Sequence, residues 1–296
     1  MSLRWSVGLV LAIGFGILQA TPAHAFCRTN SCDASRGEVC TRVDGCLTGG
    51  VPLYWANSCV TYTVQRDGST KNQISAAQLQ DAVGVAFDTW TSADCGSGTK
   101  PSISVDTLGE VDCATVEYNK EQGNANIYMF RDDTWTGTGA NALALTTVWY
   151  DWHTGKIYDA DVEINGTGGD ITNSAPQDGA DLPSIITHES GHFLGLDHSQ
   201  DSNATMFAYY LPRHDNLREL TPDDVAGICE IYPASRETAS NSCTPRHGFS
   251  SSCASEQDDG CSVTAPGKSA PAPFGIGMFA AALGVGVAFA ARRRRA

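Results

Sequence analysis

Apolar and polar residues alternate along several short stretches of this chain. Residues 59–64 and 102–105 alternate in this way, residues 126–130 are a short apolar-rich stretch, and acidic and apolar residues alternate over 159–164. A period of two places every second side chain on one face, which is typical of a half-buried β-strand. Residues 142–149 are almost continuously apolar, which also favours a strand. The pattern therefore predicts a sheet of at least five strands.

A helical period appears after the first predicted strand. Ser75 and Gln78 have the spacing of a capping box, in which each side chain satisfies a free backbone N–H at a helix start. Val83, Phe87 and Trp90 then recur at helical spacing, and we expect them to face the sheet. The stripe is interpreted as core and implies no cofactor.

Two more helices are marked by their first residues. Asp181 can cap a helix with Pro183 in its first turn, and Thr221 can cap another with Pro222 at its first position. The chain is therefore expected to contain both strands and helices.

The helix that Asp181 is expected to cap carries the strongest chemical signal. His188 and His192 are four residues apart, so they share one helical face, and Glu189 lies beside them. Gly195 can adopt the left-handed conformation that ends a helix, which lets the chain return His198 as a third ligand. Three imidazoles in an open tetrahedral set suit a catalytic zinc whose fourth position holds water, and Glu189 is placed to deprotonate that water.

This string resembles the extended zinc signature of the metzincin peptidases, in which a methionine turn follows the third histidine. Met206 stands where that methionine would form the floor beneath the ligands. Within the metzincins, a serine directly after the third histidine, here Ser199, resembles the matrixin branch. Ala208 and Tyr210 fall where matrixins carry Pro-X-Tyr along the pocket wall, although the proline is replaced by Ala208.

The resemblance covers about residues 52–233 and implies a matrixin-like catalytic domain over residues 51–234. The fold that it implies is α/β (α+β), with helices packed against a twisted mixed sheet. In matrixins an edge strand lines the cleft and pairs with an extended substrate, so the backbone near Leu143, Ala144 and Leu145 is expected to bind the peptide. An ordinary central strand is the other interpretation of this apolar run. The implied activity is hydrolysis of peptide bonds in proteins, with Glu189 as general base.

The first 25 residues are typical of a secretory signal: Arg4, an apolar stretch, and a small-residue cleavage site at Ala23-His24-Ala25. A membrane anchor is the alternative. The net charge of −14 argues against nucleic acid as a partner. We therefore expect an exported protein. We also expect it to be monomeric.

Residues 26–50 contain four cysteines, which in an exported chain suggest two local disulfides. Four cysteines can pair in three ways, and the sequence does not select one of them. The alternative is a latent enzyme in which one thiolate occupies the zinc, although the matrixin cysteine-switch motif is absent. Among the other cysteines we expect the pairs Cys95–Cys113 and Cys59–Cys229, with Cys243 and Cys253 closing a small loop.

Residues 235–273 have the composition of a flexible spacer and include Cys261. Residues 274–296 combine an apolar run, expected to be a helix, with four arginines. This arrangement resembles the C-terminal sorting signal of myxobacterial surface proteins, in which the tail is removed and the cysteine carries the envelope attachment. The chain has 11 cysteines, so Cys261 is the candidate for the unpaired one. A permanent transmembrane anchor is the alternative.

Two interpretations of metal chemistry also remain. Asp159, Asp161 and Glu163 either form the solvated face of a strand or hold a structural calcium, because carboxylate oxygens suit that ion. The whole protein could also be a non-catalytic surface adhesin that uses zinc as a structural staple. Such sites normally have four protein ligands, whereas only three are evident here.

Overall fold

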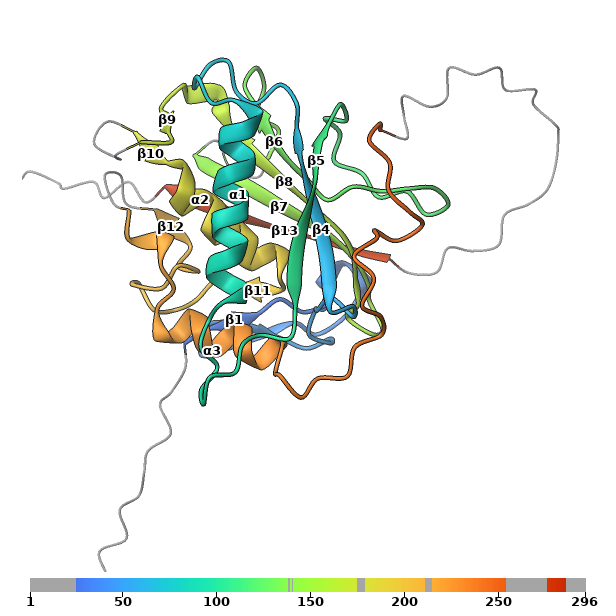
Figure 1. Ribbon diagram of the computed structural model, residues 1–296. Helices are drawn as coiled ribbons and strands as arrows, with labels where there is room; N and C mark the ends of the chain where they lie inside the picture. Colours follow the sequence, from blue (N-terminus) through green and yellow to red (C-terminus); the bar gives the residue numbers. More distant parts are fainter. Residues whose placement is uncertain are drawn as a thin grey trace, which may run out of the picture.

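Figure 1 shows the computed structural model of the chain. It describes residues 25–137, 139, 141–174, 179–210, 215–253 and 276–285. Residues 1–24 of the expected signal, and Cys261 with the arginine cluster, lie outside the described residues.

A seven-stranded sheet forms the centre of the molecule, in the order β12-β13-β7-β8-β6-β4-β5. The strands are β4 (Cys59–Gln65), β5 (Ser104–Val111), β6 (Ile127–Arg131), β7 (Ala142–Asp151), β8 (Ile157–Asn165), β12 (Tyr209–Tyr210) and β13 (Ile276–Val285). Strand β4 runs parallel to β5 and β6, and β6 runs parallel to β8, whereas β7 is antiparallel to β8. The predicted mixed sheet is confirmed.

Helices α1 (Ala76–Thr91) and α2 (Leu182–Phe193) pack against this sheet, and a third helix, α3 (Pro222–Ile231), lies below them in Figure 1. All three begin at the predicted caps, and the Ser75–Gln78 capping box of α1 is present. The apolar stripe of α1 is buried as expected: Val83, Phe87 and Trp90 are at most 2% exposed. The fold is the predicted α/β matrixin-like fold.

Several short strands and 3-10 helices complete the fold. Strand β1 (Cys27–Arg28) pairs antiparallel with β11 (Leu196–Asp197), and β2 (Thr41–Val43) forms a hairpin with β3 (Cys46–Thr48). Strands β9 (Ile171–Thr172) and β10 (Ala180–Asp181) are parallel and lead into α2. Single-turn 3-10 helices occur at Ala34–Arg36, Gly166–Gly168 and Asn216–Arg218.

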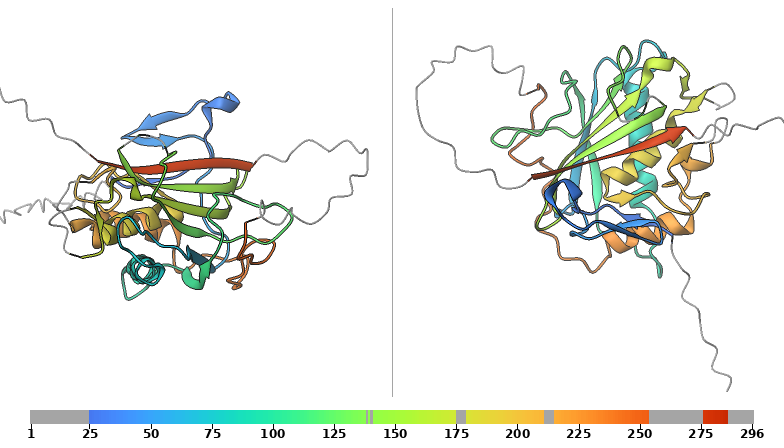
Figure 2. Two further views of the ribbon diagram at one scale, coloured as in Figure 1. Left: turned by 90° about the horizontal axis from the view of Figure 1, so that it is seen from above. Right: turned by 180° about the vertical axis from the view of Figure 1, so that it is seen from behind.

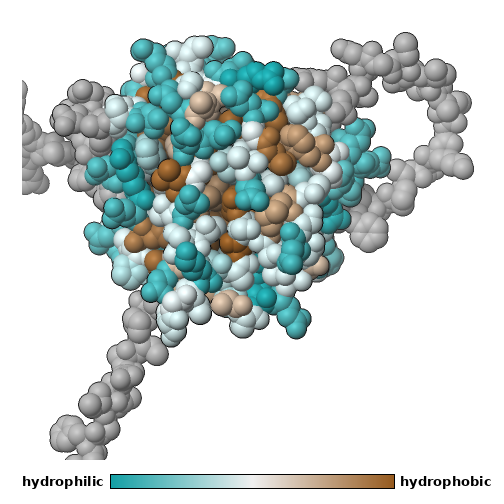
Figure 3. Space-filling model, viewed as in Figure 1, coloured by the Kyte–Doolittle hydropathy of each residue, from teal (hydrophilic) through white to brown (hydrophobic). Residues whose placement is uncertain are grey.

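The outer surface over α1 is mixed in character. Figure 3 shows brown apolar areas alternating with teal and white ones on this face. Val85 of α1 is 64% exposed and lies among such polar neighbours as Gln78 and Asp81 on the outer part of the helix. Scattered apolar residues are normal on a monomer surface. The expected monomeric state stays a prediction.

Five disulfides join ten cysteines, and three of the expected pairs are wrong. The two local N-terminal bridges are present as Cys27–Cys46 and Cys32–Cys40. The other three are long-range: Cys59–Cys243, Cys95–Cys229 and Cys113–Cys253. Cys95–Cys113 and Cys243–Cys253 were expected from proximity in the sequence and Cys59–Cys229 joined the cysteines that remained, whereas the actual pairs connect segments that meet only after the sheet and helices have assembled.

The first part of the expected flexible spacer is folded onto the domain. Ala239 donates its N–H to the Ala56 carbonyl and Asn124 donates to Gly248, at 2.9 Å in both cases. Cys253 is fully buried at the end of this strap, which comprises residues 235–253. Composition suggested a free linker, but two disulfides and main-chain hydrogen bonds fix the segment.

The expected C-terminal apolar helix is also wrong for Ile276–Val285, which form strand β13. No helix in the described ranges is long and apolar enough to cross a membrane. An apolar run of this length carries no periodicity that separates a helix from a strand. Here β7 supplies a free edge, and both views of Figure 2 show β13 lying along it.

The long-range disulfides should contribute more stability than the local ones. Replacing Cys95 and Cys229 by alanine should lower the free energy of unfolding by about 2–5 kcal/mol, because the bridge closes a long loop in the unfolded chain. Removing Cys32–Cys40, whose cysteines are only 8 positions apart, is the matched control and should cost less. Urea unfolding of both variants measures the difference; equal losses would contradict the prediction.

Candidate active site

Helix α2 and the turn after it bring the three histidines together. Asp181 caps the helix by accepting a hydrogen bond from the Ser184 N–H at 3.0 Å. The chain turns at Gly195, whose φ is +100° and where an added Cβ would lie 2.8 Å from the Leu53 carbonyl oxygen. Glycine is therefore required at this turn. Strand β11 follows it and delivers His198.

The imidazoles converge on one point. One nitrogen from each of His188, His192 and His198 lies within 4.8 Å of the others. The Nε2 atoms of His192 and His198 are 3.2 Å apart. The Nε2 atom of His188 is buried and has no hydrogen-bond partner among the described residues. Three converging nitrogen lone pairs form a ligand set suited to zinc.

The opposite ring nitrogens are held by the main chain. The His188 Nδ1 atom lies 2.6 Å from the Thr205 carbonyl oxygen, and the His192 Nδ1 atom lies 2.8 Å from that of Leu196. A carbonyl can only accept, so each Nδ1 carries the proton and each Nε2 keeps its lone pair. The hydrogen bonds therefore set both the tautomer and the ring orientation that a metal needs.

Burial keeps these rings neutral. Desolvation, with the neighbouring His198, lowers the pKa of His188 to about 3. The same two causes, together with His188, lower the pKa of His192 well below its usual value. Neutral imidazole is the form that binds metal. The residues present thus fit a zinc ion.

Glu189 is fully buried next to this set. The Thr146 hydroxyl donates a hydrogen bond of 2.5 Å to the Glu189 Oε2 atom. Thr146 lies in the middle of β7, so the sheet fixes the orientation of a carboxylate that belongs to the helix. Sequence reasoning did not find Thr146, because it is 43 positions from Glu189 and belongs to no local motif.

Met206 packs beneath the helix as expected and is 1% exposed. An added Cβ at Gly191 would lie 2.2 Å from the Met206 sulfur and 2.8 Å from the Trp90 ring. The missing side chain at Gly191 therefore makes room for the methionine under the ligand helix. The Ser199 N–H donates to the Met206 carbonyl at 2.8 Å, which ties the turn to the third histidine.

Asp224 of α3 organises the methionine turn. It accepts hydrogen bonds from the N–H groups of Thr205 and Met206, at 2.8 and 3.0 Å. It also completes a capping box with Thr221. The Thr221 cap was predicted from the sequence, but the role of Asp224 in the capping box and its contact with the turn were not, since only the folded chain brings α3 beneath the turn.

The comparisons with known proteins agree with this geometry. Residues 98–233 match the sequence model of the matrixin family. The chain is 41% identical over 75 residues to metalloendoproteinase 1 of Glycine max, covering 25% of this chain and 24% of that protein. It is 27% identical over 192 residues to human neutrophil collagenase, covering 63% and 34%, and 27% identical over 179 residues to karilysin of Tannerella forsythia, covering 60% and 33%.

These matches show that the region around the three histidines is similar to matrixins. The aligned part covers about a quarter to a third of each of these relatives.

The residues predicted to bind substrate lie around this matrixin-like site. Leu143, Ala144 and Leu145 lie in β7, directly before Thr146. Ala208 precedes β12, and Tyr210 within β12 is 1% exposed, with its hydroxyl accepting the Asp181 N–H at 3.0 Å. The Tyr210 side chain is thus part of the core, and only its backbone faces a neighbouring strand. Substrate binding by these five residues stays a prediction.

Arg218 is a residue that the sequence did not single out. Its guanidinium forms a two-pronged interaction with the Asp181 carboxylate, with nitrogen–oxygen distances of 2.8 and 2.5 Å. The interaction joins the segment after the methionine turn to the start of α2. A lone arginine in a loop offers no sequence signal for this role.

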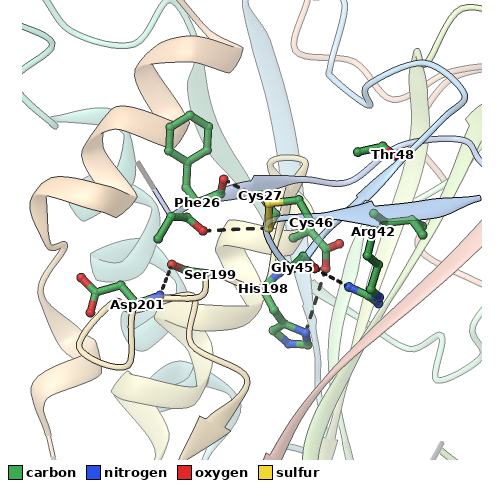
Figure 4. The surroundings of a disulfide bond; sticks show 12 residues. Phe26, Cys27, Arg42, Gly45, Cys46, Thr48, His198, Ser199 and Asp201 are labelled. Atoms are coloured by element: carbon green, nitrogen blue, oxygen red, sulfur yellow. Dashed lines mark hydrogen bonds and ion pairs between the residues drawn. A yellow bond between two sulfur atoms is a disulfide. The ribbon is translucent and has the colours of Figure 1, made fainter. Parts of the chain in front are cut away.

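The N-terminal cysteine segment supports the third histidine. Strand β1 pairs with β11 immediately before His198, and the Gln200 N–H donates to the Ala25 carbonyl at 3.1 Å. Figure 4 shows the Cys27–Cys46 disulfide beside His198 and Ser199. All four cysteines of residues 26–50 are in disulfides, so the interpretation of a thiolate on the zinc is wrong and the disulfide cap is confirmed.

The neutral histidines should make the metal-free protein sensitive to acid. The pKa of His188 is about 3 in the fold and 6.5 as the ordinary value, so the unfolded chain binds more protons in between. Stability is then fully present above pH 6.5 and falls as the pH drops below it. His188→Gln should make the loss of unfolding free energy between pH 7 and 5 smaller by about 2 kcal/mol.

Urea unfolding of chelator-treated wild type and His188→Gln at the two pH values measures this difference. His153→Gln, at an exposed turn, is the control and should retain the wild-type pH dependence. The same pH dependence in wild type and His188→Gln would contradict the prediction.

Proposed function

We propose that this protein is an exported zinc endopeptidase that cuts peptide bonds within proteins, with Glu189 as its general base. One observation carries the proposal: three imidazoles, of which those of His188 and His192 are buried and neutral, converge next to a carboxylate that Thr146 holds in place. A purely structural metal site would need a fourth protein ligand and would have no use for the positioned carboxylate.

The three histidines would hold the ion, which supplies an acidified water and polarises the substrate carbonyl when bound. Glu189 accepts a proton from the attacking water and passes it to the leaving amine. Thr146 fixes the Oε2 atom of Glu189 and thereby orients the carboxylate for this transfer. The buried position of Glu189 keeps bulk water from competing for the proton.

The extended substrate would lie against β7, with the backbone of Leu143–Leu145 pairing with it. Ala208 and the backbone of β12 would form the wall of the pocket beyond the cut bond. Five disulfides support an oxidising compartment, in agreement with a signal over residues 1–25. The tail with Cys261 and the arginines would attach the protein to the cell envelope.

Glu189→Ala should retain zinc but lose activity by a factor of about 100 or more, because proton transfer is lost while all three ligands remain. Cleavage of a quenched-fluorescence peptide and of casein measures it, with zinc content determined in parallel. The control is Glu121→Ala at an exposed loop, which should cleave like wild type.

A zinc chelator should abolish cleavage by wild type, and added zinc should restore it. Undiminished turnover in Glu189→Ala would remove the role assigned to this carboxylate. Bound zinc without cleavage by any variant would favour the adhesin, or a latent enzyme that needs processing of residues 26–50.

We also propose a structural calcium at the acidic residues of β8. Asp159 and Asp161 are fully buried, and neither carboxylate oxygen of Asp159 has a hydrogen-bond partner among the described residues. Burial, with the neighbouring Asp161, raises the pKa of Asp159 well above its usual range. Two adjacent buried carboxylates are costly unless a cation neutralises them, and their oxygen atoms suit calcium.

Calcium should therefore raise the melting temperature of the wild type by several degrees, equivalent to about 2.7 kcal/mol at 100 times the dissociation constant. Asp159→Asn preserves the shape but removes the charge, and should not respond. Asp133→Asn, at an exposed position, is the matched control and should respond like wild type. Identical melting of the wild type with calcium and with a calcium chelator would contradict the proposal.

A further inference from the structure

The chain's own C-terminal strand lies along the free edge of β7. Strand β13 is antiparallel to β7 from Ile276, opposite Asp151, to Gly284, opposite Ala142, with one register shift between Leu283 and Gly284. Its far end is parallel to β12, with Gly284 opposite Tyr209. Strand β13, drawn in red in the right-hand view of Figure 2, lies between β7 and β12 in the sheet.

The register carries β13 past the centre of the site. Ala281 is opposite Thr146, the residue that holds Glu189, and Ala282 is opposite Leu145. Leu283 is opposite Ala144, so β13 covers the backbone expected to bind the substrate. Strand β13 also contacts α2, the helix of the first two histidines and Glu189.

A substrate and β13 cannot use this edge together. Each N–H and C=O on the edge of a strand pairs with one neighbouring strand, so a peptide can join β7 only where β13 has left it. The two run in the same direction as well, since the expected substrate is also antiparallel to β7. Strand β13 therefore takes the position, the backbone partners and the polarity of a substrate.

We propose that residues 276–285 are an intramolecular inhibitor that occupies the substrate cleft, so that the full chain is active only when this strand is displaced. The inference rests on the proposed peptidase function and adds its regulation. A segment tethered to its own cleft acts at an effective concentration of about millimolar, which exceeds most free substrates. Release of β13 would expose the edge and start activity.

Proline can remove β13 from the edge without altering the rest of the chain, because it has no N–H and disrupts a strand ladder. Successive N–H groups of a strand point to opposite edges, so the pair Ala280→Pro and Ala281→Pro must delete one that faces β7. The matched control is the pair Ala270→Pro and Ala272→Pro, the same chemistry before β13 begins.

The three full-length proteins are compared by peptide cleavage. The pair in β13 should raise kcat/KM through a lower apparent KM, with kcat unchanged, because an occupied cleft only reduces the competent fraction. The gain in kcat/KM is about tenfold if β13 occupies the cleft in about nine of every ten molecules. The control pair should match wild type. Equal kcat/KM in wild type and the β13 pair would overturn the inference.

Hydrogen exchange tests occupancy without activity, using the same proline pairs in full-length Glu189→Ala. Alternate amides of β7 should be protected with the natural β13 and with the control pair, and should exchange faster with the β13 pair. Unchanged exchange would overturn the inference. This is also the result expected if the apolar run inserts into a membrane instead of pairing with β7. Faster exchange with no cleavage by any protein carrying Glu189 would support occupancy and reject the peptidase function.

Discussion

The hydrogen bonds between two imidazole Nδ1 atoms and main-chain carbonyls are the constraint on which the site depends. They fix His188 to Thr205 and His192 to Leu196, and so direct two Nε2 lone pairs toward the same point. Both carbonyls belong to turns that follow the helix. The ligand helix is therefore functional only if those turns are held at the correct height beneath and beside it.

Most of the surrounding structure serves that requirement. Asp224 holds the turn that contains Thr205, and strand β1 pairs with the turn that contains Leu196. The Cys95–Cys229 disulfide ties α3, which carries Asp224, to the end of α1. Segments from both ends of the domain thus determine the orientation of two rings, which a helix alone could not do.

The sheet contributes a second requirement that conflicts with stability. A peptide substrate needs an unpaired strand edge, and such an edge attracts any extended segment within reach. In this chain β13 pairs with that edge beside Glu189 and Thr146. The same backbone groups thus serve recognition of a substrate and contact with the protein's own C-terminal segment.

The sequence alone determined the features that depend on local spacing. It predicted the three helix caps, the strands, and the ligand set of His188, His192 and His198, because a helical period or a capping box acts over a few residues. Tertiary structure decided the pairing of Cys95 with Cys229, the contact of Thr146 with Glu189, and the strand formed by Ile276–Val285. Each of these joins positions far apart in the chain, and no local pattern records which distant segments will meet.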